Sequence, residues 1–305
     1  MATYLHENDE HKQLREQARK WASQVIAPHA AEWEENEEFP VSVYASAAEA
    51  GLLGVGYPEA IGGTGGDVTH VLAVAEEMIL AGKSVGTVVS LGSHGIALPP
   101  LVKFGTPEQK ERYVRPVLEA KKISALAITE PSGGSDVAAI RTKAVKDGDH
   151  YVVNGSKTFI TSGTRADFVV TAVRTGPEGH AGMSLLVIDR DTPGFSVSKK
   201  LKKTGWWASD TAELHFEDCR VPRANLVGME NAGFIAIMMN FTQERLLLAS
   251  QCVAIAELAY RESIAYARER TAFGKHLVGH QVIRHKLADM ATRLAAARAL
   301  TGELA

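Results

Sequence analysis

The sequence predicts an α+β multidomain fold in which a β domain is inserted between two helical domains. Three patterns predict this order. Residues 1–122 show the apolar spacings of three and four that are typical of helices, residues 123–228 show strand patterns, and residues 229–305 return to helical spacing. Helices and strands that are segregated along the chain favour α+β over a doubly wound α/β fold, in which the two would alternate.

The N-terminal domain is predicted to begin with an amphipathic helix, because an apolar stripe runs from Leu14 to Val25. A glycine-rich loop at 61–66 precedes a second helical segment at 68–80. Thr106, followed by proline, has the pattern of a helix N-cap, so a further helix is expected to begin there.

The β domain is predicted to contain several short strands. The segment 151–160 indicates two strands around an Asn-Gly turn that begins at Asn154. Further strands are expected at 168–173, 184–188 and 212–216, with turn signals between them.

The C-terminal domain is predicted to hold a long helix from Ala232 to about Arg270 and a last helix that begins near Gln281. Each carries an apolar stripe, and a helical bundle normally needs about four helices to bury such stripes. Partner chains are therefore expected to supply the rest, unless the chain lacks the end of its bundle.

Composition excludes several classes of protein. The net charge of −3 does not favour nucleic-acid binding. Two cysteines allow at most one disulfide, which fits a reducing compartment, and the acidic N-terminal region argues against a mitochondrial transit peptide. The most apolar segment, 234–239, is too short to span a bilayer. A cytoplasmic protein without a membrane span is predicted.

The segment 126–136 is the most informative for function. An apolar strand, which includes Leu126 and Ile128, runs into a glycine-rich turn that holds Thr129, Gly134 and Ser135. Exposed amides in such a turn can bind an anionic group such as a pyrophosphate. A plain interdomain linker would have the same composition.

A second segment, Phe159, Ile160 and Thr161, ends a predicted strand with an aromatic and a β-branched residue. These side chains could pack against a flat ring, although ordinary strand packing is the alternative.

Glu244 is the candidate base. It lies three residues after Phe241 and four before Leu248, so it falls on an apolar helix stripe where a hydrophobic residue is expected. Desolvation there would raise its pKa toward the range of a useful base, whereas a buried structural ion pair is the alternative. The predicted stripe consists of Ile237, Phe241, Leu248, Cys252, Ile255 and Ala259.

Two other patterns argue against cofactors of other kinds. The segment 54–58 starts like a dinucleotide-binding turn but lacks the third glycine, so no nicotinamide is expected. His276 and His280 are spaced four residues apart without a third ligand in zincin spacing, so no metal is predicted.

Taken together, these segments resemble the acyl-CoA dehydrogenase family. The resemblance covers the whole chain, in order. Its motifs are Leu53–Glu59 with Gly62-Gly63, Thr129-Glu130-Pro131 through Gly134-Ser135-Asp136, Asn154–Lys157 with Phe159–Thr161, Gly205–Thr211, Asp218–Pro222, and Arg270 with Phe273-Gly274 and His280-Gln281.

The resemblance implies a helical domain (1–122), a β-barrel domain (123–228) and the first two helices of a C-terminal bundle (229–305). It also implies a bound FAD and places three groups of residues. Leu126, Ile128, Thr129, Gly134, Ser135, Phe159, Ile160 and Thr161 would contact FAD within the subunit; Arg270, Phe273 and Gln281 would reach the FAD of a neighbour in a homodimer or homotetramer; and Ser135, Phe241 and Arg245 would contact the acyl-CoA. Phe159 stands where many members carry Trp.

The implied reaction is oxidation of an acyl-CoA to the trans-2-enoyl-CoA, with an electron-transferring flavoprotein as acceptor. Isovaleryl- and long-chain-type members place the catalytic Glu where this sequence has Glu244; other members place it in a later part of the bundle, beyond residue 305. Two alternatives remain: a flavin oxidase or monooxygenase relative, and a catalytically silent scaffold or partner subunit of the same fold.

Overall fold

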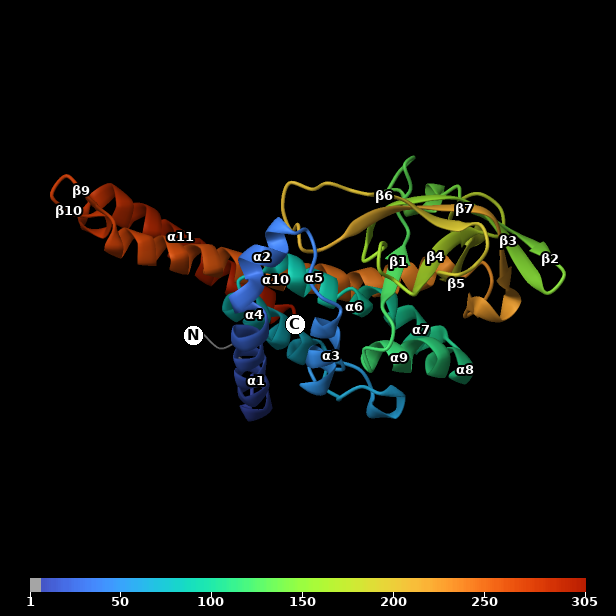
Figure 1. Cartoon of the computed structure of the whole chain (residues 1–305), viewed down its shortest axis with the longest axis horizontal. Coiled ribbons are helices and arrows are strands. Elements are labelled where there is room, and N and C mark those ends of the chain that lie inside the picture. Colours follow the sequence, from blue (N-terminus) through green and yellow to red (C-terminus); the bar gives the residue numbers. More distant parts are fainter. Residues whose placement is uncertain (1–6) are drawn as a thin grey trace. The chain divides into compact units, whose positions relative to one another are not determined.

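The computed structural model describes residues 7–305 and divides into two compact units (Figure 1). Of the described residues, unit 1 takes up 7–30, Gly66–Val85 and Arg245–Ala305. Unit 2 takes up Ala31–Gly65 and Gly86–Glu244. The long helix α10 (Gly233–Glu269) contributes to both. The domain boundaries drawn from the sequence stay a prediction.

Unit 1 is helical. It contains α1 (Asp9–Val25), α4 (Val68–Gly82), the C-terminal part of α10 and α11 (Gln281–Glu303), with the short strands β9 (Thr271–Ala272) and β10 (Lys275–His276) between the last two helices. The predicted long helix and last helix are confirmed. Both α1 and α4 begin with a capping box, in which the N-cap side chain and the third helical residue exchange hydrogen bonds with backbone amides.

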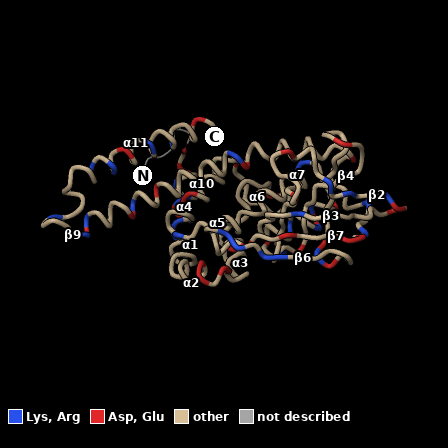
Figure 2. The backbone as a smooth tube through the Cα atoms, turned by 90° about the horizontal axis from the view of Figure 1, so that it is seen from above, with Lys and Arg blue, Asp and Glu red and all other residues tan. Residues whose placement is uncertain are grey.

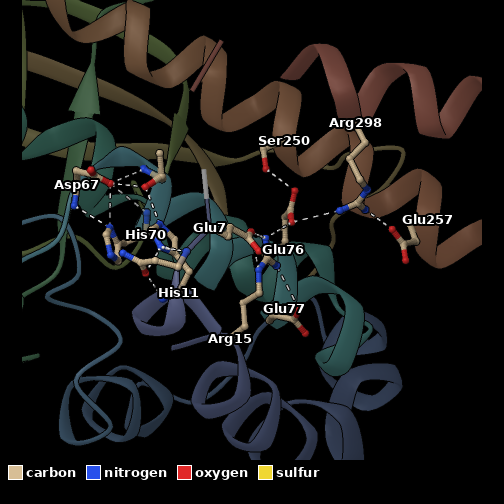
Figure 3. Close-up of polar contacts among 12 residues, drawn as sticks. Glu7, His11, Arg15, Asp67, His70, Glu76, Glu77, Ser250, Glu257 and Arg298 are labelled. Atoms are coloured by element: carbon tan, nitrogen blue, oxygen red, sulfur yellow. Dashed lines mark hydrogen bonds and ion pairs between the residues drawn. The ribbon is translucent and has the colours of Figure 1, made fainter. Parts of the chain in front are cut away.

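A buried network of ion pairs joins the helices of unit 1 (Figure 3). The guanidinium of Arg15 on α1 contacts Glu76 and Glu77 on α4 at 2.9 and 3.2 Å. Glu76 also accepts a hydrogen bond from Ser250 on α10 at 3.0 Å and lies 3.6 Å from Arg298 on α11. Because Glu76 is fully buried, these partners are what make its charge tolerable in the core.

Unit 2 begins with short helices. They are α2 (Ala30–Glu35), α3 (Ser42–Glu49), α5 (Val85–Leu91), α6 (His94–Ala97), α7 (Pro99–Phe104), α8 (Pro107–Gln109), the π-helical turn Lys110–Val114 and α9 (Arg115–Leu118). The helix start predicted at Thr106 is confirmed: the Thr106 side chain caps α8, and Pro107 is its first residue.

The sheet of unit 2 has eight strands within residues 7–305. They are β1 (Ser124–Ala127), β2 (Lys143–Asp147), β3 (His150–Thr161), β4 (Phe168–Arg174), β5 (Met183–Asp189), β6 (Phe195–Lys200), β7 (Thr211–Pro222) and β8 (Leu226–Val227). Their order is β6-β7-β3-β2-β4-β5-β8, and β1 pairs with β4 in parallel.

This sheet is not a closed barrel, so that expectation is wrong. The two edge strands are β6 and β8. Strand β8 has only two residues and β6 is mostly exposed, so the two edges do not pair with each other in a long buried ladder. The fold class itself, helical segments flanking a β domain, is confirmed.

The predicted hairpin at Asn154 is also wrong, because β3 runs unbroken through it. The register between β3 and β7 shifts between Val153 and Gly155, which marks a β-bulge. A Cβ at Gly155 would lie 2.5 Å from Thr142 Oγ1, and the Asn154 side chain exchanges two hydrogen bonds with Asp218, each 2.9 Å. The Asn-Gly pair therefore serves tertiary contacts rather than a turn.

Both faces of the central strand β4 are buried. Along β4, Phe168 and Val170 belong to one apolar cluster and Val169 and Val173 to the other, which follows the period of two of a strand. The first cluster includes residues of α6, α7, α9 and the start of α10. The sheet is thus a core layer that fixes the loops at its ends.

One segment, Val85–Phe104, is long and apolar enough by length and composition to cross a membrane, and 56% of its most apolar window is buried inside the structure. It comprises α5, α6 and α7 rather than the segment 234–239 chosen from the sequence. Core helices of globular proteins share this composition.

Candidate functional site

The turn after β1 is exposed and closed by two backbone hydrogen bonds. Glu130 and Gly133 exchange their N–H···O bonds at 3.0 Å, and residues 131–136 are all exposed. Gly134 lies against Thr129, because a Cβ at Gly134 would be 3.0 Å from Thr129 Cγ2. Within residues 7–305, no backbone acceptor takes the amides of Gly134 and Ser135, so they remain available to a polar ligand.

A buried ion pair fixes this turn from beneath. Lys157 Nζ on β3 donates to Glu130 Oε1 and to the carbonyl of Ile128, both at 2.9 Å. Glu130 also accepts from the amides of Arg141 and Thr142 at 2.7 and 2.9 Å. These hydrogen bonds connect the strand before the turn and the loop after it to the same ion pair. Lys157 is fully buried.

The two pKa values follow from this burial. Desolvation lowers the pKa of Lys157 to about 8, against the opposing effect of Glu130. Burial alone would raise the pKa of Glu130, but the charge of Lys157 and the hydrogen bonds of Thr142 and Arg141 hold it below its usual value. Both groups are therefore ionised at neutral pH.

Phe159 projects from a bulge next to the turn. The register of β3 against β7 shifts between Lys157 and Ile160, and Phe159 has a left-handed φ of 60° with 68% of its surface exposed. The amide of Thr158 donates to the carbonyl of Thr129 at 2.9 Å, which joins this strand to the turn. An exposed aromatic ring in a costly backbone conformation indicates a functional constraint.

The predicted cofactor residues thus fall into two groups. Thr129, Gly134, Ser135, Phe159 and Thr161 lie at the accessible surface or partly so. Leu126, Ile128 and Ile160 are buried in the two apolar clusters, where they support the turn and the bulge. An exposed ring beside free amides fits a flat cofactor with a polar edge.

Phe159→Gly tests this reading of the bulge. Glycine adopts a left-handed φ without the roughly 1–2 kcal/mol cost that other residues bear. The exposed ring contributes little packing, so we expect unfolding in urea to show unchanged or higher stability, while FAD binding weakens. A loss of stability together with normal FAD affinity would show that Phe159 only packs against the strand.

Glu244 is half-buried on α10 and oriented by a neighbour one turn away. Its Oε1 accepts a hydrogen bond from Asn240 Nδ2 at 2.5 Å, and the same nitrogen donates to the carbonyl of Ile96 on α6 at 2.8 Å. Asn240 is 5% exposed. The amide therefore anchors the carboxylate to α6. Sequence reasoning missed Asn240, although its spacing of four from Glu244 was a usable signal.

The apolar stripe used to select Glu244 is only partly buried, which corrects the expectation. Ile237 is 1% exposed, but Leu248 is 49% exposed and Cys252 is also exposed. Beyond Glu244 the buried face of α10 instead includes Ser250, Val253 and Ala254. The predicted stripe assumed that one face of the helix, repeating every 3.6 residues, is buried along the whole helix. The buried face changes instead, because α10 packs against different partners along its length. Phe241 is half-buried and Arg245 exposed.

The remaining predicted FAD residues lie in unit 1, around a tight hairpin. Strands β9 and β10 are joined by Phe273 and Gly274, which both have positive φ, as a type I′ turn requires. Phe273 is 97% exposed. Arg270 precedes the hairpin, and Gln281 is the first residue of α11; both are exposed.

His11, Asp67 and His70 form a group with the ligand types of a metal site, and their ligand atoms lie within 4.8 Å of one another (Figure 3). The two rings stack with centroids 3.9 Å apart. Each histidine belongs to the capping box of its own helix, and His11 Nε2 also lies 2.8 Å from Thr69 Oγ1. These contacts give the group a structural role. His280 Nε2, for its part, lies 3.0 Å from the carbonyl of Ala272.

Comparison with protein-family models gives three consecutive matches. The acyl-CoA dehydrogenase N-terminal domain matches residues 8–121, its middle domain residues 125–219 and its C-terminal domain residues 231–305.

Individual proteins are similar over nearly the whole chain. An acyl-CoA dehydrogenase of Bacillus subtilis is 38% identical over 97% of this chain and 78% of its own length. The mitochondrial long-chain specific acyl-CoA dehydrogenase of Sus scrofa is 39% identical over 96% of this chain and 68% of its own length. The crystal structure of a probable acyl-CoA dehydrogenase from Mycobacterium abscessus superposes with a TM-score of 0.95 and is 52% identical in sequence. The match covers 96% of this chain and 78% of that one.

Proposed function

We propose that this chain, which belongs to the acyl-CoA dehydrogenase family of FAD-dependent oxidoreductases, oxidises the saturated acyl group of a CoA thioester to the trans-2-enoyl-CoA. The observation that supports this most is the exposed surface made by the turn 129–136 and the Phe159 ring, held in place by the buried Lys157–Glu130 pair. FAD would lie against this surface, with Thr129 and Ser135 as hydrogen-bond partners.

The protein's own residues would bind, orient and deprotonate the substrate. Ser135, Phe241 and Arg245 would position the acyl-CoA, and hydrogen bonds to the thioester carbonyl would stabilise the charge that develops on it. Glu244 would take the α-proton, with its carboxylate held by Asn240. FAD, held by the turn 129–136 and Phe159, would supply the acceptor for the hydride that leaves the β-carbon. The proton and the hydride together account for the two hydrogens lost.

Identification of the bound chromophore tests the cofactor. Denaturation of the purified protein should release FAD, and an electron-transferring flavoprotein should accept the electrons during turnover. Release of a nicotinamide, or of no chromophore, would contradict the proposal. Hydrogen peroxide formed in step with product would indicate an oxidase.

We also propose a homodimer or homotetramer. Apolar side chains remain exposed along α10, α11 and the hairpin between them: Tyr266 at 61%, Phe273 at 97%, Val282 at 66% and Leu300 at 64%. Exposed apolar side chains on helices that also carry charged residues of both signs (Figure 2) favour association with a partner chain. Arg270, Phe273 and Gln281 would then reach the FAD of a neighbouring copy. A monomer in sedimentation at micromolar concentration would contradict this. Cytoplasmic location stays a prediction.

A further inference from the structure

Asn240 places an amide on the buried face of α10, one turn before Glu244. It follows Ala236 and Ile237 at the helical spacing of four and three, and only 5% of its surface is exposed. An apolar residue is expected at such a position. The presence of an amide must therefore be explained by the contacts that it makes.

The first contact is with a carbonyl that has no donor in its own helix. If the helix of α6 continued, the carbonyl of Ile96 would accept from the N–H of residue 100, or in a tighter turn from that of residue 99. These residues are Pro99 and Pro100, which have no N–H. Asn240 Nδ2 donates to this carbonyl at 2.8 Å and supplies the missing hydrogen bond.

The second contact uses the other N–H of the same nitrogen. A primary amide has two N–H donors and one acceptor oxygen. Because one N–H points to Ile96, the other is left to donate to Glu244 Oε1, at 2.5 Å. If the amide turned over, its oxygen would face two oxygen acceptors at once, which is repulsive. Asn240 is therefore a fixed donor to Glu244.

The oxygen of the amide shows that stability alone does not favour asparagine here. Within residues 7–305, Asn240 Oδ1 is buried and has no hydrogen-bond partner. A buried acceptor without a partner costs free energy that an apolar side chain would avoid. The benefit of the amide lies instead in the two hydrogen bonds that it directs at Ile96 and Glu244.

The fixed donor favours the charged form of Glu244. A hydrogen bond stabilises a carboxylate, whereas a protonated carboxyl could not donate to a nitrogen that has no acceptor. Within one turn of Glu244 on α10, and along α6, the other titratable side chains are Arg245 and His94. Arg245 is exposed, and burial lowers the pKa of His94, so that its ring is neutral at pH 7.

We propose that Asn240 is a positioning residue that keeps Glu244 ionised and holds its carboxylate in one orientation before the substrate binds. This rests on the proposed function, in which Glu244 takes the α-proton. Because only the carboxylate can take a proton, the rate of flavin reduction should rise with pH as Glu244 ionises. Asn240 then sets the pH at which this rise occurs.

Replacement of the amide should move the rise to higher pH. Asn240→Leu removes the donor, and Asn240→Asp places a second carboxylate beside the first, so that the two share a proton. In both variants the midpoint should move up by about one to two pH units, the effect of one charge-assisted hydrogen bond. Gln243→Leu removes an exposed amide from the adjacent position of α10 and should leave the midpoint unchanged.

Two measurements give this midpoint. Stopped-flow reduction with saturating acyl-CoA gives the pH profile of the rate. Infrared titration without substrate, taken as the difference between each protein and its Glu244→Gln counterpart, gives the protonation of Glu244 itself. Asn240→Asp has the same shape as the parent and carries the test if Asn240→Leu does not fold.

An infrared midpoint that is the same in the parent and in the Asn240 variants would overturn the proposal, even if those variants were less stable. Failure of the proposed function appears elsewhere: the infrared midpoint would move as expected, yet acyl-CoA would not reduce the flavin of the parent at any pH.

Discussion

Glu244→Gln should slow flavin reduction by acyl-CoA on the order of 10²–10⁴-fold, the usual contribution of a positioned general base. Glutamine keeps the size of the side chain, and its carbonyl oxygen can still accept the hydrogen bond that Asn240 donates. The basic carboxylate is lost while the local packing stays. FAD content and acyl-CoA binding should therefore equal those of the parent.

Anaerobic stopped-flow mixing with acyl-CoA, followed by flavin absorbance, measures this step. Glu16→Gln makes the same chemical change at an exposed position on α1 and serves as the control. Reduction within about threefold of the parent rate would show that Glu244 is not the base. Normal reduction with lower stability would instead indicate a structural carboxylate.

Lys157→Met should destabilise the protein by about 3–5 kcal/mol, because it leaves the Glu130 carboxylate buried without its counter-ion. The turn 129–136 should lose its position, and FAD affinity should fall with it. The double variant Glu130→Gln/Lys157→Met has no unpaired charge and should recover much of this stability. Urea unfolding of the parent and of these two variants measures the differences in stability. A cost below about 1 kcal/mol for Lys157→Met would show that the pair does not fix the turn.

The same pair gives a pH dependence. Burial lowers the pKa of Lys157 from 10.5 to about 8. Between pH 8 and 10.5 the unfolded chain therefore binds more protons at this residue than the folded protein does. The free energy of unfolding of the parent should thus rise with pH in this range, relative to that of the double variant. The pKa of Glu130 is lowered from 4.5, so its contribution is present above 4.5 and is lost as the pH falls through the folded value. Matching pH profiles of the parent and the double variant would contradict this.

The sequence predicted those elements that follow from local rules. Helix α10 appeared as a long segment without proline, and α8 as an N-cap followed by proline. The turn predicted at Asn154-Gly155 was wrong because the conformation of this pair is set by Thr142 and Asp218, of which Asp218 is distant in sequence. Closure of the sheet depends on strand lengths at its edges, which periodicity does not give.

The same distinction holds for the candidate site. Glu244 stood out as a charged residue among apolar ones, although the stripe that singled it out proved only partly buried. The role of Lys157 was missed because its partner Glu130 is far away in sequence, even though both lie in the motifs that suggested the family. Local patterns therefore pointed to the proposed base, whereas the residues that position it and the turn could be identified only from the fold.

We propose that this chain removes two hydrogens from an acyl-CoA. The most direct measurement is anaerobic mixing of the purified, FAD-loaded protein with saturated acyl-CoA thioesters of different chain lengths, with product mass determined beside flavin absorbance. At least one thioester should bleach the flavin and yield a product two hydrogens lighter. FAD-loaded protein that leaves every thioester unchanged would contradict the claim.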